Sequence, residues 1–110
     1  MQVRLEQKGD VSVFKIAGNI DIETSPEMKK EIDKAMAGKQ KKVVMNLREV
    51  SYIDSSGLAT LVEVLKNLRS YGGKMKISDL SDKISGLFEI TKLNKLFDIV
   101  QDEASAINSF

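Results

Sequence analysis

The sequence predicts an α/β fold: one small domain spanning residues 1–110, with a mixed β-sheet of four to five strands and about four helices. The length of 110 residues is typical of a single domain. Residues 3–17 contain two strand-like segments joined by a short turn, which indicates an antiparallel hairpin. Helical and strand patterns then alternate to the end of the chain. That alternation is typical of parallel strands connected by helices.

The hairpin is predicted from alternating side chains and a turn. Val3 and Leu5 alternate with charged residues, as in a strand with one buried face. Lys8-Gly9-Asp10 is a turn signal, and Val11–Ala17 reads as the second strand. Gly18-Asn19-Ile20-Asp21 is expected to leave the sheet.

A first helix should begin near residue 25. Thr24 with Glu27 fits a capping box, whereas Pro26 after Ser25 fits a proline at the first helical position. The two registers differ by one residue, and the sequence leaves both open. Gly38 is a plausible stop. The expected buried face shares helical spacing and comprises Met28, Ile32, Ala35 and Met36.

The middle of the chain predicts a central strand and a long helix. Lys42–Leu47 is apolar on both faces, which favours a strand covered on two sides. The segment from Leu58 to Leu68 is predicted to be helical and to end at Tyr71-Gly72-Gly73. Its apolar stripe comprises Leu58, Leu61, Val62, Leu65 and Leu68.

The last third predicts two strands and two helices. Met75–Ile77 and Phe97–Val100 read as strands, and the final helix should start at Asp102 or Glu103 and reach Phe110. Between the strands, Ser81 is expected to cap a third helix. The expected face of that helix comprises Ile84, Leu87 and Phe88, with Ile90 as an optional fourth member.

Composition excludes several classes of function. The chain has no cysteine and no histidine, which removes disulfides, thiol nucleophiles, Cys/His metal sites and the base of a Ser-His-Asp triad. No cofactor is expected. The net charge of +1 gives no electrostatic case for direct nucleic-acid binding. The N-terminus lacks the apolar core of a signal peptide, and no run is long enough to span a bilayer, so a cytoplasmic protein with no membrane partner is expected.

The most informative segment is Ile53–Leu58, where Asp54, Ser55 and Ser56 lie between an apolar strand and a helix. Helix N-termini favour anions, so a serine at this position is well placed to carry a phosphate. Asp21 follows the second strand as Asp54 follows the third. Because a helix connects these strands, they should be parallel and should bring both aspartates to one rim of the sheet.

These segments resemble the STAS domain. The resemblance covers nearly the whole chain and rests on residues 18–21, 44–47 and 52–58, with Tyr71-Gly72-Gly73-Lys74 and Gly86-Leu87-Phe88 in support. More narrowly, the chain is similar to bacterial anti-sigma-factor antagonists.

That resemblance implies a phosphorylation switch. In the family, the serine that follows the aspartate is phosphorylated by a partner that is both anti-sigma factor and serine kinase; here it is Ser55. The unphosphorylated antagonist binds the anti-sigma factor and frees the sigma factor, and a serine phosphatase resets the phosphorylated form. Asp21 and Asp54 match acidic positions that flank the family's phosphorylation site.

Each site residue also has a purely structural interpretation. Ser55 could simply cap the helix, and Ser56 could cap or pack, with phosphorylation as the alternative for both. Asp54 and Asp21 could be caps or solvated loop carboxylates, or they could orient the Ser55 hydroxyl or contact the kinase. Gly57 is expected to permit a close backbone approach or an unusual dihedral angle.

The sequence raises two alternative functions. An enzyme is disfavoured because the chain has no Gly-x-Ser-x-Gly elbow and no phosphate-binding loop of the Gly-x4-Gly-Lys-Ser/Thr type. A STAS interaction module without a phosphoswitch, working in a transport or stress-signalling assembly, stays open.

Overall fold

A five-stranded mixed sheet organises the protein, and the computed structural model describes all residues from 1 to 110. The strands lie in the order β1-β2-β3-β4-β5. β1 is antiparallel to β2, and every other neighbouring pair is parallel, which confirms the predicted sheet. The strands are β1 (Gln2–Lys8), β2 (Val11–Ile20), β3 (Lys42–Ile53), β4 (Lys74–Ser78) and β5 (Asp98–Val100).

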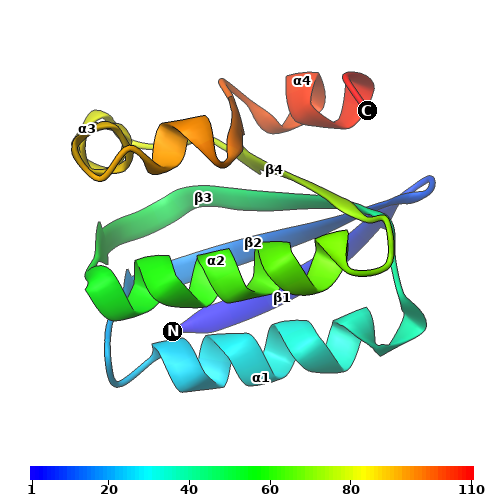
Figure 1. The fold of residues 1–110 in the computed structure, drawn as a ribbon, viewed down its shortest axis with the longest axis horizontal. Helices are drawn as coiled ribbons and strands as arrows, with labels where there is room; N and C mark the ends of the chain where they lie inside the picture. Colours follow the sequence, from blue (N-terminus) through cyan, green and yellow to red (C-terminus); the bar gives the residue numbers. More distant parts are fainter.

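Helices cover both faces of the sheet. Figure 1 shows α1 and α2 side by side on one face, with α3 and α4 over the other. All four predicted helices are present. They are α1 (Ser25–Ala35), α2 (Ser55–Arg69), α3 (Asp82–Ile90) and α4 (Glu103–Asn108), with short 3-10 turns at Met36–Gly38 and Leu93–Lys95.

β2 and β3 are longer than predicted. Their parallel pairing runs from Val11 opposite Lys42 to Ile20 opposite Ile53, through two register shifts. β3 therefore continues six residues beyond the predicted end at Leu47, and the segment 18–20 belongs to β2 instead of leaving the sheet. The prediction ended where the continuous apolar run ended, but backbone pairing continues through a stretch in which exposed side chains are interspersed with the buried Val50 and Ile53.

α1 begins in the predicted register that has Thr24 at the N-cap, but the capping box itself does not form. Thr24 occupies the N-cap position, but its hydroxyl makes no cap hydrogen bond and donates instead to the Asn19 carbonyl at 2.7 Å. Ser25 is the first helical residue, so Pro26 is the second. At the other end the helical path continues through Gly38, and the left-handed residue that stops it is Lys39, with φ of +54°.

The main core lies between the sheet and α1 with α2, and extends to α3. The predicted buried faces of α1 and α2 are present, with Val64 buried and Val62 only partly buried. The assignment of Ile90 to the buried face of α3 is wrong, because this residue is 81% exposed. At about 100° per residue, position 90 lies well away from the face made by Ile84 and Phe88.

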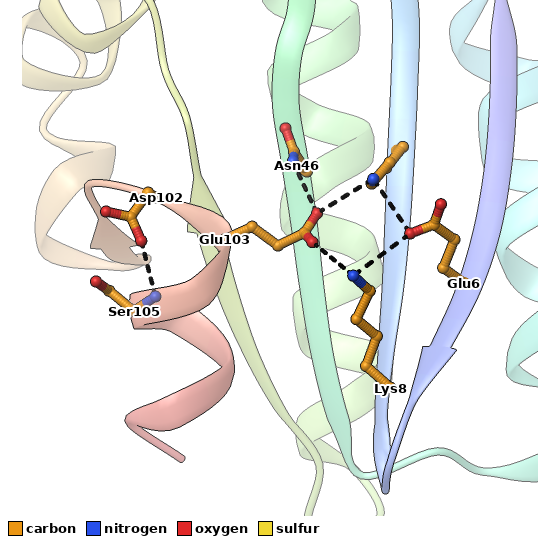
Figure 2. A network of polar contacts seen from close by, with 7 residues as sticks. Glu6, Lys8, Asn46, Asp102, Glu103 and Ser105 are labelled. Carbon is orange, nitrogen blue, oxygen red and sulfur yellow. Dashed lines mark hydrogen bonds and ion pairs between the residues drawn. The ribbon is translucent and has the colours of Figure 1, made fainter.

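A polar network fastens α4 to the other face of the sheet (Figure 2). The Glu103 carboxylate accepts a hydrogen bond from the Asn46 amide at 2.9 Å and lies 3.4 Å from the Lys8 ammonium. The ammonium of Lys15 lies 3.8 Å from Glu103 and 3.1 Å from the Glu6 carboxylate. Beside this network, α4 covers a small apolar cluster formed by Val11, Val13, Val44 and Ala106.

This network predicts an acid-sensitive contribution to stability. Burial raises the pKa of Glu103, but the Asn46 hydrogen bond and the charges of Lys15 and Lys8 outweigh it, so the pKa lies below the usual 4.5. The stabilisation is therefore present above about pH 4.5 and is lost as the pH falls through the lower pKa of the folded state. Glu103→Gln should reduce the free energy of unfolding by about 1 kcal/mol at pH 7.

Urea unfolding at neutral and acidic pH measures this effect. The difference in the free energy of unfolding between wild type and Glu103→Gln should disappear in acid. Glu89→Gln on α3 is the control, because that exposed carboxylate makes no ion pair, and its free energy of unfolding should equal that of wild type at every pH. A gap of constant size across the titration would contradict a role for the Glu103 charge.

Candidate functional site

The carboxyl ends of β2 and β3 meet at one rim of the sheet. The Asp54 N–H donates to the Ile20 carbonyl at 3.0 Å, and the Ile22 N–H donates to Asp54 Oδ2 at 3.2 Å. These bonds tie the β2–α1 loop to the junction between β3 and α2. The predicted convergence of Asp21 and Asp54 on one rim is confirmed.

Asp54, and not Ser55, caps α2. Its Oδ1 accepts the Gly57 N–H at 3.1 Å, so the structural interpretation of Asp54 as a cap is confirmed and that of Ser55 is wrong. Ser55 is the first residue of the helix and is exposed. Ser56 is partly buried, and its carbonyl accepts the Thr60 hydroxyl at 3.0 Å. Of the two serines, Ser55 is the more accessible.

Removing the Asp54 cap should loosen the start of α2. Asp54→Ala loses the bonds to Gly57 and Ile22 and should lower the free energy of unfolding by about 1–2 kcal/mol. Asp54→Asn keeps an acceptor for the helix and should lose less than half of that. Thermal unfolding measures both variants, and equal losses would mean that charge, and not capping, is what Asp54 supplies.

Hydrogen bonds to Asp21 stabilise the conformation of the β2–α1 loop. Its Oδ1 accepts the N–H groups of Glu23 and Thr24, each at 3.0 Å, and its carbonyl accepts the Ser25 N–H at 2.8 Å and the Ser25 hydroxyl. Neither Asp21 nor Asp54 forms an ion pair with a lysine or arginine. Two carboxylates without a salt-bridge partner therefore lie on the rim that carries Ser55.

Gly57 lets α2 approach the sheet closely, which confirms the first of its two expected roles. A Cβ at this position would lie 2.6 Å from Ile20 Cγ2, 2.8 Å from Ile53 Cγ2 and 2.9 Å from the Ile20 carbonyl oxygen. Its φ is not positive, so close packing and not an unusual dihedral angle is what favours glycine here.

An apolar groove of about 650 Å³ adjoins Ser55. Its walls come from the end of β3, the start of α2 and one side of α3, and include Tyr52, Ser55, Leu58, Ile84, Leu87 and Ile90. The chain exposes four large hydrophobic side chains: Leu5 on β1, Ile22, Tyr52 and Ile90. Tyr52 and Ile90 line the groove, while the Ile22 N–H bonds to Asp54 on the rim.

Sequence reasoning missed these exposed apolar residues. Ile22 lies between two acidic residues, and Ile90 lies out of phase with Ile84 and Phe88, so both could have been recognised as apolar residues outside the core. Tyr52 follows the predicted end of β3 and carries no comparable signal. Exposed apolar side chains that share one groove, as Tyr52 and Ile90 do, indicate an interaction site.

A five-stranded mixed sheet with helices on both faces, and an exposed serine starting the helix after the third strand, defines the class of a STAS domain. Residues 2–106 match the STAS domain family, and the chain belongs to that family. No helix in the structure has the length and apolar character needed to cross a membrane.

Relatives of the chain indicate which group of STAS domains it resembles. It is 33% identical over 94 residues to the anti-sigma-B factor antagonist of Bacillus subtilis, covering 86% of this chain and 84% of that protein. Among solved structures, an anti-sigma factor antagonist from Mycobacterium paratuberculosis superimposes with a TM-score of 0.90 at 23% identity, covering 98% and 92% of the two chains. The Bacillus cell fate determinant SpoIIAA in its phosphorylated form gives 0.72 at 19% identity, with 97% of each chain covered. These two structures support the fold.

Proposed function

We propose that this protein is an anti-sigma-factor antagonist that is switched by phosphorylation of Ser55. The unphosphorylated form binds an anti-sigma factor that is also a serine kinase, and this binding releases the sigma factor. Phosphorylation ends the binding, and a serine phosphatase restores it. The observation that carries the proposal is an exposed Ser55 at the first position of a helix that Asp54 already caps.

The start of α2 can hold a phosphate without rearrangement. A phosphoserine adds about −1.5 to −2 charges at neutral pH, and the N-terminus of a helix favours such an anion. Tight packing at Gly57 holds this end of α2 against Ile20 and Ile53. The added charge therefore acts on the partner across the contact surface. On this protein's side of that surface, Asp54 and Asp21 already contribute negative charge.

The protein acts by binding and not by turnover in this proposal. Ser55 has no histidine to serve as its base, because the chain contains none. A second candidate is a STAS interaction module without a phosphoswitch, in a transport or stress-signalling assembly. The exposed Ile22, Tyr52 and Ile90 favour it, because an apolar docking surface needs no modification to work.

One experiment separates the two candidates. The protein is mixed with a candidate anti-sigma-factor kinase, an ATPase of the histidine-kinase type, with either ADP or ATP. Gel filtration follows the complex, and mass spectrometry follows the modification. A complex in ADP, with one phosphate on Ser55 and dissociation in ATP, is expected. A phosphate on Ser56 would refute the site, and an unmodified complex in both nucleotides would favour the plain interaction module.

A further inference from the structure

We propose that two copies of this chain associate through the free edge of β1, with Leu5 of one copy opposite Leu5 of the other. β1 is the outermost strand of the sheet, drawn at the right of Figure 2, and it spans seven residues. An edge strand of this length is a template for pairing with another strand. β5, at the opposite edge, spans three residues, and such short edges are poor templates.

The backbone of β1 has an unused row of hydrogen-bonding groups. Lys8 and Val11 flank a two-residue turn, so they form a hydrogen-bonded pair across the hairpin. Such pairs alternate along an antiparallel ladder, and the amide groups of Val3, Leu5 and Gln7 therefore point away from β2. No backbone hydrogen bond outside the ladder involves any residue of β1. The outward groups are free to pair with a second strand.

The order of the charges on β1 identifies that second strand as another β1. In an antiparallel pair centred on Leu5, Arg4 of each copy lies opposite Glu6 of the other. A shift of two residues in one direction brings Arg4 opposite Arg4. The opposite shift brings Glu6 opposite Glu6 and Arg4 opposite Lys8, so like charges meet in both cases. Charges on an edge strand commonly oppose pairing, but this series is complementary to itself in one register.

The two charged side chains are available for these contacts. Arg4 is exposed and makes no ion pair within the chain. The Glu6 carboxylate lies 3.1 Å from the Lys15 ammonium, and its two oxygens can also accept from a guanidinium. Across the new edge, Arg4 and Glu6 would form a non-hydrogen-bonded backbone pair, which is the kind that brings opposite side chains closest.

The other face of β1 adds an apolar contact. Leu5 is 45% exposed, and it lines a hollow of about 200 Å³ together with Val3, Phe14 and Ala35. In the proposed register, Leu5 of the second copy lies beside this hollow, and the two leucine side chains shield each other from water. One exposed aliphatic residue of β1 is thus covered by its own copy.

The first test reverses one charge on the edge. A contact made by a single strand is small, so we expect a weak dimer that forms at high protein concentration, as measured by sedimentation velocity. Arg4→Glu sets like charges opposite each other at both Arg4–Glu6 positions and should raise the dimer dissociation constant at least about tenfold. Lys66→Glu is the matched control. It makes the same change in net charge at an exposed residue of α2 without an ion pair, and its dissociation constant should stay within about twofold of wild type.

A second measurement uses wild-type protein and follows the alternation of the backbone. Hydrogen exchange of the Val3, Leu5 and Gln7 amides should slow as the protein concentration rises, because pairing with a second copy protects them. The amides of Arg4 and Glu6 already face β2, so their exchange should change little. This alternating pattern is specific to the edge of β1, and it can be measured even if Arg4→Glu does not fold.

Two outcomes would overturn the proposal. A protein that stays monomeric up to millimolar concentration would refute the edge contact. A dimer that Arg4→Glu leaves intact, or one without the alternating protection, would mean that the copies meet at another surface. Neither outcome bears on the proposed function, because no residue of β1 lines the groove that contains Ser55. Failure of phosphorylation at Ser55 would likewise leave the edge contact standing.

Discussion

Replacing Ser55 with alanine is expected to give a protein that binds its anti-sigma-factor partner as wild type does but is never released by ATP. Ser55 is exposed and does not cap α2, so the substitution should change stability by less than about 0.5 kcal/mol. Isothermal titration calorimetry in ADP should give a wild-type affinity. In ATP the wild-type complex should dissociate, while the Ser55→Ala complex persists.

The size of the switch follows from simple electrostatics. Two unit charges about 4 Å apart interact by about 4 kcal/mol at an effective dielectric constant of about 20. An affinity loss of about 100-fold needs only about 2.8 kcal/mol. Repulsion together with a steric clash over Ser55 can supply this amount. Ser55→Asp should weaken binding by less than the phosphate does, because one carboxylate carries less charge than a phosphate dianion.

Ser56→Ala is the matched control for this prediction, since it removes the neighbouring hydroxyl. It should be phosphorylated and released like wild type. Stoichiometric labelling of Ser55→Ala by the kinase would falsify the assignment. Large changes in amide chemical shifts across the sheet on phosphorylation would contradict a switch that works without refolding.

Gly57→Ala should be strongly destabilising. The added Cβ would come within 2.6 Å of Ile20 Cγ2 and 2.9 Å of the Ile20 carbonyl oxygen, and the backbone atom cannot move aside cheaply. Overpacking of this kind typically costs about 1–3 kcal/mol. The start of α2 would have to shift away from the sheet, and Ser55 would move with it.

Gly86→Ala on α3 provides the control, because nothing lies within 4 Å of the Cβ that it adds. Alanine favours a helix over glycine by up to about 1 kcal/mol, so this variant should match or exceed wild-type stability. Urea unfolding measures both. Equal stability of Gly57→Ala and wild type would show that α2 adjusts without loss.

The fold could largely be predicted because its signals are local. The turn at Gly9, the apolar stripe of α2 and the Ser81 and Asp102 caps all lie within a few residues of what they determine. Element ends were less predictable. β3 reaches Ile53 because β2 pairs with it, and no continuous apolar run marks that extension.

The site was predictable in place but not in detail. Parallel strands on either side of a helix are enough to bring Asp21 and Asp54 to one rim. Which group caps α2 depends on the backbone of Asp54, and the contact between Glu103 and Asn46 joins residues 57 positions apart. The groove forms only where α3 lies over the end of β3, close to the start of α2. The sequence pattern of neither helix contains that arrangement.

The two tyrosines have an optical consequence. The chain has no tryptophan, so its ultraviolet emission comes from Tyr52 and Tyr71 alone. Tyr52 borders the groove, whereas Tyr71 lies beyond the far end of α2 and donates its hydroxyl to the Gln40 carbonyl at 2.9 Å. In Tyr71→Phe, the tyrosine emission would come from Tyr52 alone, which lines the same groove as Ser55. Occupancy of this rim could then be followed in real time without attaching a dye.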